Sequence, residues 1–393
     1  MLLRKNKAIV AALDSLVGVL FLIPLAIERA LRKKGASPPR SILIMELWGI
    51  GDLVMMSSVL KPLREHYPQA HISLLAKNTV RELFAHNPYI DDFIIFDFPW
   101  TRFRKKYAFW KWNWPGLSKT INKLRQKKFD LVIDARGDIR NNLLSFLING
   151  KRRIGYSCSG GGYFLTDALL PKGKNRHRVD TWLGLLNHLG IETDKYKPSL
   201  YITQEEEKTA RNFLIKQGIK NRELLVGIHP GAKIKSRCWP LANFARVAEH
   251  IRDTFGAKII VFIEPEGYGE EIPIKRDFIK AKIPLREMTC LVKLVDLLVC
   301  NDSGAMHIAT AVGTKTLSIF GPGDYKRIGP YGTGHTIIAD NEVKCRPCFD
   351  SCKYDKALCL NKISVDMVVN AANSILIKSK REAIQIESSP YLH

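Results

Sequence analysis

The segment from Leu297 to Pro322 constrains the fold of this 393-residue chain more than any other. It begins with a short apolar run, Leu297–Cys300, which is typical of a buried strand. A turn then leads into a helix predicted over Ala305–Val312, and Thr316–Phe320 has the pattern of the next strand. A strand, a helix and a strand in this order make one unit of a parallel sheet, so the sequence predicts an α/β fold.

The turn before this helix has the composition of an anion site. Asp302 or Ser303 would be the N-cap, and Ser303 with Gly304 leaves backbone N–H groups open at the positive end of the helix dipole. Phosphate favours that geometry, and His307 would lie in the first helical turn, within reach of the same anion. The segment alone fits an ordinary strand-to-helix corner equally well.

Length and charge bound the organisation of the chain. At 393 residues it fits two domains, and 46% hydrophobic with 25% charged residues is a globular composition. A formal charge of +23 implies an anionic partner: nucleic acid, a membrane surface or a phosphorylated substrate. We expect an N-terminal membrane-associating segment, a first domain, a second domain and a disordered tail, over residues 1–40, 41–200, 201–380 and 381–393.

Residues 8–27 form an apolar segment about long enough to cross a bilayer, with cations on both sides. Asp14 and Pro24 make a clean span less favourable, and the basic flanks suit a helix that lies in the interface of an anionic leaflet. If the segment does span, the heavier positive flank puts the body of the protein in the cytoplasm. A core helix packed on the first domain is the alternative.

The first domain begins at Ser41–Leu47, a predicted buried strand. Trp48-Gly49-Ile50-Gly51-Asp52 follows as a tight turn into a helix, which places Asp52 at the mouth of the sheet, where doubly wound folds bind ligands. The third glycine of a dinucleotide fingerprint is absent, so we predict no nicotinamide site.

Tryptophans and cations are mixed between Phe98 and Trp114, a segment that includes Trp110 and Trp112. This mixture suits the headgroup level of a membrane or a large amphiphilic anion. Single-stranded nucleic acid uses the same residue types, and a solvated loop is the remaining alternative.

A second candidate site follows the strand predicted over Leu224–Ile228. The next residues run from His229-Pro-Gly231 through Lys233 to Arg237-Cys-Trp239-Pro240, and three cations in such a loop resemble a diphosphate clamp. Glu264 and Glu266 come at the outer end of the next strand. The alternative is a solvated loop.

The Gly49-Ile-Gly-Asp52, His229-Pro-Gly231, Arg237-Cys-Trp-Pro240 and Asp302-Ser-Gly-Ala-Met-His307 motifs, in this order and spacing, resemble glycosyltransferase family 9, the bacterial heptosyltransferases. The resemblance covers about Ile42 to Ala372. It implies a GT-B architecture, in which two Rossmann-like domains face each other with the active site between them.

The resemblance also implies roles for residues of this chain. Asp52 occupies the position of the family's proposed general base, and Arg237 stands where the family usually has a lysine. Ser303, Gly304 and His307 match the diphosphate-binding turn, Asp302 matches the residue that meets the donor sugar, and Glu264 or Glu266 would contact the nucleoside ribose. The donor side therefore comprises Lys233, Arg237, Glu264, Glu266, Asp302, Ser303, Gly304 and His307.

The implied reaction is a single displacement with inversion that needs no metal and no cofactor. The expected donor is ADP-heptose, and the expected acceptor is a lipopolysaccharide core or related glycolipid. The acceptor and membrane side is assigned to Gly49, Gly51, Arg136, Trp110 and Trp112. The enzyme would work at the cytoplasmic face of the bacterial inner membrane, on an anionic membrane surface and without nucleic acid.

Other functions stay open at this point. A sugar-nucleotide-binding protein or an epimerase can share the fold, and a basic nucleic-acid-binding protein would use the charge differently. Four thiols, Cys345, Cys348, Cys352 and Cys359, could bind zinc or an iron–sulfur cluster, but we predict no metal site.

Overall fold

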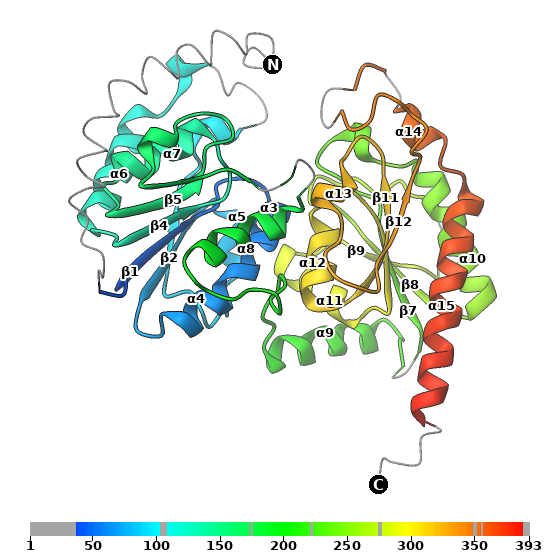
Figure 1. Ribbon diagram of the computed structural model, residues 1–393. Coiled ribbons are helices and arrows are strands. Elements are labelled where there is room, and N and C mark those ends of the chain that lie inside the picture. The colour runs from blue at the N-terminus through cyan, green and yellow to red at the C-terminus, as the bar shows by residue number, and fades with distance from the viewer. Residues whose placement is uncertain are drawn as a thin grey trace. The chain divides into compact units, whose positions relative to one another are not determined.

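The computed structural model describes residues 37–102, 108–171, 173, 176–220, 223–273, 277–348, 352–354 and 357–387. The membrane-associated helix predicted over residues 8–27 lies outside these ranges. The chain divides into two compact units, Met1–Pro198 and Ser199–His393, and each is described by itself (Figure 1).

The first unit is built on a parallel sheet of six strands in the order β3-β2-β1-β4-β5-β6. In this order β2 and β3 lie on one side of β1, and β4, β5 and β6 lie on its other side, so the direction of strand addition reverses between β1 and β4. Such a switch point leaves a crevice at the carboxyl ends of the two central strands. The strands are β1 (Ser41–Met45), β2 (His71–Ala76), β3 (Asp92–Ile95), β4 (Leu131–Asp134), β5 (Arg152–Tyr156) and β6 (Asp167–Leu169).

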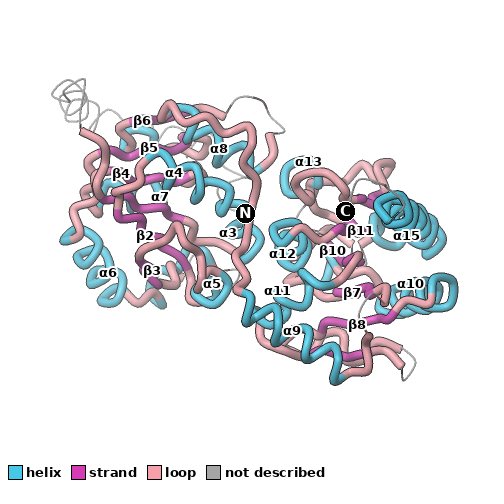
Figure 2. Tube along the Cα trace, turned by 90° about the horizontal axis from the view of Figure 1, so that it is seen from below, coloured by secondary structure: helices cyan, strands magenta, loops and turns pink. Residues whose placement is uncertain are grey.

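Helices cover both faces of this sheet (Figure 2). On one face, Leu43, Met45 and Val132 pack against Leu124 and Leu144, since alternate residues of a strand point to opposite layers. That face carries α6 (Trp114–Gln126) and α7 (Ile139–Leu147), which contact each other. The other helices of the first unit are α3 (Ile50–Met56), α4 (Leu60–His66), α5 (Thr79–Leu83) and α8 (Arg178–His188). Among them, α3 contacts both α5 and α8.

The second unit repeats the strand order of the first. Its parallel sheet runs β12-β11-β10-β7-β8-β9, so β7 and β10 are the central strands and their carboxyl ends flank a second switch point. The strands are β7 (Leu225–His229), β8 (Lys258–Phe262), β9 (Ile279–Ala281), β10 (Leu297–Asn301), β11 (Lys315–Phe320) and β12 (Thr336–Ala339).

The core of the second unit lies between its sheet and two long helices that run side by side in Figure 1, α10 (Leu241–Phe255) and α15 (Val365–Glu387). Val226, Val299 and Ile319 pack there with Phe244 and Leu376. The remaining helices are α9 (Gln204–Lys216), α11 (Leu285–Leu294), α12 (Gly304–Val312), α13 (Tyr325–Ile328) and α14 (Leu358–Asn361).

The prediction of an α/β fold with parallel sheets is confirmed. One difference is at the C-terminus, where α15 continues to Glu387, into the tail that we expected to be disordered. The residues there include the helix formers arginine, glutamate, glutamine and alanine, which explains the extension. No helix of the described residues is both long enough and apolar enough to cross a bilayer.

Candidate active site

The first candidate site lies at the carboxyl ends of β1 and β4. Asp52 is the third residue of α3, and its Oδ2 accepts a 3.4 Å hydrogen bond from the backbone N–H of Gly49, the residue that caps the helix. The turn between β1 and α3 therefore places the Asp52 carboxylate at the switch point of the sheet.

Two arginines face Asp52. Arg136, from the loop after β4, places Nη1 3.0 Å from Oδ1 of Asp52, and its guanidinium stacks on the ring of Trp48 at 4.0 Å from the ring centroid. Arg178, at the start of α8, places Nε 3.9 Å from the same oxygen. The two guanidinium groups therefore place positive charge beside the Asp52 carboxylate.

Two further carboxyl groups, those of Glu46 and Asp134, are buried near Asp52 and the two arginines. Glu46 is 1% exposed and its Oε1 accepts a 3.2 Å hydrogen bond from the backbone N–H of Trp48. Burial, with a smaller contribution from the charge of Asp52, raises the pKa of Glu46 to about 8. Burial also raises the pKa of Asp134 to about 6. At neutral pH Glu46 is therefore mostly protonated and Asp134 mostly ionised.

The second candidate site lies at the carboxyl ends of β7 and β10. Asn301 is fully buried and joins the two loops there, because its Nδ2 donates to the Pro230 carbonyl at 2.6 Å and its Oδ1 accepts from the Trp239 N–H at 3.1 Å. The structure thus brings two of the predicted motifs together through a residue to which we had assigned no role.

Asp302 and Arg237, both predicted on the donor side, contact each other. Arg237 Nη1 lies 3.2 Å from Asp302 Oδ2, and their side chains are 18% and 3% exposed. Gly323, after β11, sits so close to Asp302 that a Cβ there would overlap with Oδ2. The donor-side acid is therefore held by a cation on one side and by backbone on another.

The N-terminus of α12 keeps its donors available. Ser303 is the N-cap residue, but its side chain does not cap the helix, and its buried Oγ has no hydrogen-bond partner among the described residues. Gly304 begins the helix and His307, 5% exposed, lies in its first turn. These residues can present N–H and hydroxyl donors to an oxyanion.

The other predicted donor residues differ in their placement. Glu264 Oε1 lies 3.5 Å from Nε2 of His229, a buried residue at the end of β7, and a Cβ at Gly231 would lie 2.4 Å from Glu264. Lys233 and Glu266 are exposed in their loops. Of the two glutamates, Glu264 is the one in contact with the loop after β7.

The aromatic segment divides between core and surface. Trp100 is 6% exposed and donates through Nε1 to Asn141 at 3.2 Å, and Trp112 packs against the same core. Trp110 and Trp114 are 78% and 52% exposed. Packing in the core thus accounts for Trp100 and Trp112 without a membrane. The cations at 104–106 lie outside the described residues.

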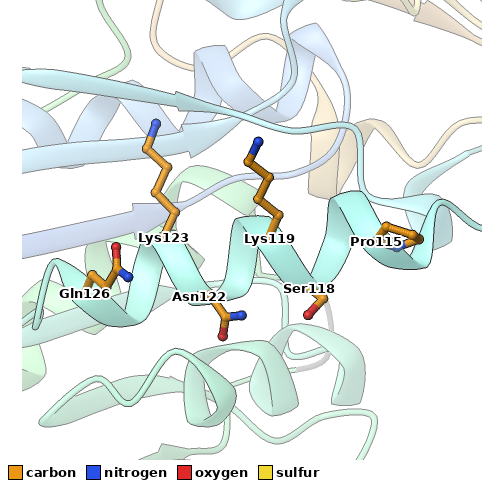
Figure 3. A pocket seen from close by; sticks show the side chains of 6 residues that line it. All are labelled: Pro115, Ser118, Lys119, Asn122, Lys123 and Gln126. Atoms are coloured by element: carbon orange, nitrogen blue, oxygen red, sulfur yellow. The ribbon is translucent and has the colours of Figure 1, made fainter.

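An open depression elsewhere on the first unit is lined by one face of α6 alone (Figure 3). It contains none of the predicted site residues and lies on a single helix, so it supports no active site. Its lining residues are Pro115, Ser118, Lys119, Asn122, Lys123 and Gln126.

The four clustered cysteines all have free thiols, and Cys359 is buried while the others are half-buried. Within the described ranges, no three His, Cys, Asp or Glu side chains are arranged to hold a metal ion.

Sequence reasoning missed Glu46, Arg178 and Asn301. Glu46 did leave a signal, since an acidic residue interrupts the apolar run Ser41–Leu47. Arg178 left none, because nothing local relates the start of α8 to a turn far earlier in the chain.

The sequence profile of glycosyltransferase family 9 (heptosyltransferase) matches residues 117–358. The chain belongs to this family. The resemblance found in the motifs is confirmed, and this family 9 member is a glycosyltransferase.

Relatives agree with this assignment over most of their length. The family 9 chain is 24% identical to the lipopolysaccharide core heptosyltransferase OpsX of Haemophilus influenzae, over 79% of this chain and 87% of that protein. A solved family 9 glycosyltransferase from Veillonella parvula has a TM-score of 0.73 at 23% identity, covering 88% of this chain and 100% of that one. The Escherichia coli heptosyltransferase WaaC, solved with ADP-2-deoxy-2-fluoro heptose, has a TM-score of 0.64 at 15% identity, covering 85% and 99%. These solved structures share the fold.

Proposed function

We propose that this enzyme transfers a heptose or a related sugar from a nucleotide donor, ADP-heptose in the first place, to a lipopolysaccharide core or related glycolipid. The observation that carries the proposal is Asp52 at the first switch point, held beside Arg136 at 3.0 Å. The donor and acceptor classes draw support from the name of OpsX and from the ligand in the WaaC structure.

In the proposed step, Asp52 takes the proton of an acceptor hydroxyl. The oxygen of that hydroxyl attacks the anomeric carbon of the donor sugar at the same time. The new glycosidic bond forms as the bond between that carbon and the diphosphate oxygen breaks. The nucleoside diphosphate leaves with the electron pair, and the anomeric configuration inverts because attack comes from the opposite side.

Charge on the leaving diphosphate would be met by the second unit. Positive charge and donors would come from Arg237, from the N–H groups in the first turn of α12 and from the Ser303 hydroxyl, where that charge develops. Asp302 would meet hydroxyls of the donor sugar, and Glu264 those of the ribose. We propose that these groups suffice without a metal ion, so activity should survive chelation.

The proposal needs the two units to close on each other as facing Rossmann-like domains, so that Asp52 meets the donor's anomeric carbon. The formal charge of +23 and the exposed Trp110 support a peripheral position on an anionic membrane, at the cytoplasmic face of the inner membrane.

A donor screen tests the proposal. Melting of the protein is compared with ADP, UDP, GDP and dTDP, since a ligand that binds only the folded state raises the melting temperature. We expect ADP to give the largest shift, and ADP-heptose with a lipopolysaccharide core acceptor to give a glycosylated product. No transfer from any nucleotide sugar to any glycolipid would contradict it.

A further inference from the structure

Arg346 links the loop after β12 to the turn after β11. Its Nη1 donates to the Asp340 carbonyl at 2.5 Å, within its own loop. Its Nη2 donates to the Gly323 carbonyl at 3.4 Å, in the turn after β11. The guanidinium carbon lies 5.8 Å from the ring centroid of Tyr325, the first residue of α13. One planar group therefore joins the backbone of both segments.

The turn after β11, residues 321–324, packs directly against Asp302. A Cβ at Gly323 would lie 2.0 Å from Asp302 Oδ2, so the backbone of the turn adjoins the carboxylate itself. The backbone of Asp302 is fixed separately, since its N–H donates to the Ile319 carbonyl of β11 at 3.1 Å. The carboxylate is thus held between this turn and Arg237, and a shift of the turn would change where it points.

The composition of this turn gives it little stiffness of its own. Two of its four residues are Gly321 and Gly323, and glycine loses more conformational freedom on folding than any other residue. The end of the turn is tied to α13, because the Asp324 side chain accepts from the Lys326 N–H at 3.2 Å. Arg346 adds a contact earlier in the turn, at the glycine that adjoins the carboxylate.

We propose that Arg346 is a positioning residue for the donor sugar: it holds the turn after β11 against Asp302 and so orients the Asp302 carboxylate toward the sugar hydroxyls. The proposal rests on the function proposed above, in which Asp302 meets the sugar while Arg237 and α12 meet the diphosphate. Because Arg346 acts through Asp302, its loss should impair use of the sugar and spare affinity for the nucleoside diphosphate alone.

Transfer from ADP-heptose and inhibition by ADP, measured side by side, test this proposal. The proteins compared are the wild-type enzyme, Arg346→Ala and a matched control, Lys344→Ala, which removes an exposed cation of the same loop. We expect Arg346→Ala to lower kcat/KM for ADP-heptose on the order of tenfold or more, while the inhibition constant of ADP stays within about twofold. Lys344→Ala should change neither.

A double-mutant cycle with Asp302→Asn shows whether the arginine acts through the aspartate. If it does, the two losses are not additive, and Arg346→Ala combined with Asp302→Asn should have nearly the kcat/KM of Asp302→Asn alone. Losses that multiply would show that Arg346 acts independently of Asp302 and would overturn the proposal.

An equal loss of sugar transfer and of ADP inhibition in Arg346→Ala would assign the arginine a purely structural role and also overturn the proposal. If Arg346→Ala fails to fold, Arg346→Lys decides by the same two measurements, since lysine keeps the charge but lacks the planar fork that reaches both carbonyls. If the wild-type enzyme transfers nothing from ADP-heptose, the proposed donor fails. Amide hydrogen exchange of residues 320–324 then tests the arginine separately, and unchanged exchange in the Arg346 variant overturns its role.

Discussion

Arg136 Nη1 lies 3.0 Å from Asp52 Oδ1, and this pair joins the loops that follow the two central strands of the first sheet. In the second unit Arg237 and Asp302 lie 3.2 Å apart at the corresponding place, but the acid now follows β10 and the arginine follows β7. Both switch points therefore hold an arginine–aspartate pair, with the charges exchanged between the two strands.

Replacing Asp52 with Asn should remove the base while keeping the shape of the turn. We expect kcat to fall by about a hundredfold or more, because proton transfer by a positioned side chain contributes on that order. Affinity for the nucleotide donor should hardly change. Single-turnover transfer and calorimetric donor binding measure the two effects, and a loss of donor binding in Asp52→Asn would refute the role of general base.

Arg237→Lys should weaken donor binding, because a lysine offers a single point of contact where the guanidinium can use two. We expect a rise in the dissociation constant for ADP of roughly tenfold. Lysine keeps a positive charge near the buried Asp302, which Arg237→Ala would leave without its cation.

Lys235→Ala is the control, since Lys235 is an exposed cation in the same short helix, Lys235–Arg237. An equal loss of ADP affinity in both variants would show that the loop contributes general charge, with no specific contact from Arg237.

Glu46→Gln should change how stability depends on pH. The pKa of Glu46 is about 8 in the folded protein, where Asp52, Asp134, Arg136 and Arg178 surround it, and its ordinary value is 4.5. Because the pKa is higher in the folded protein, protonated Glu46 contributes to the free energy of unfolding. This contribution is fully present below pH 4.5 and is lost as pH rises toward about 8.

Denaturant unfolding at about pH 5 and about pH 8.5 measures this effect. We expect the wild-type protein to lose a few kcal/mol more than Glu46→Gln between these pH values, at about 1.4 kcal/mol for each unit of pKa. Glutamine keeps an acceptor for the N–H of Trp48. Parallel pH profiles for the two proteins would show that Glu46 is ionised in the folded state.

Asn301→Ala should destabilise the second unit by roughly 2–5 kcal/mol, since it leaves the Pro230 carbonyl and the Trp239 N–H without their partner. Asn341→Ala is the control: Asn341 is exposed and accepts a single hydrogen bond from the Tyr325 hydroxyl. Thermal unfolding compares the two. A similar small shift in both variants would mean that the loops at β7 and β10 do not depend on Asn301.

Much of the scaffold follows from local pattern. The strand predicted over Leu224–Ile228 is observed one residue later, at Leu225–His229, and the strand and helix around Ser303 were placed within a residue, because apolar runs and glycine-rich turns mark them clearly. The pairing of Arg237 with Asp302 could not be predicted, since each was assigned to a different part of the donor. Trp112 was assigned to a membrane side from composition, which does not reveal that the indole packs on the core.

The contact between Gly323 and Asp302 also bears on redesign of this enzyme for other sugars. Because any side chain at 323 would displace the Asp302 carboxylate, libraries that vary the turn after β11 should hold that position fixed. Exposed positions such as Lys233 and Glu266 offer freedom to mutate without disturbing this packing. A search for altered donor preference should therefore keep Gly323 and Asp302 unchanged and vary exposed positions such as Lys233 and Glu266.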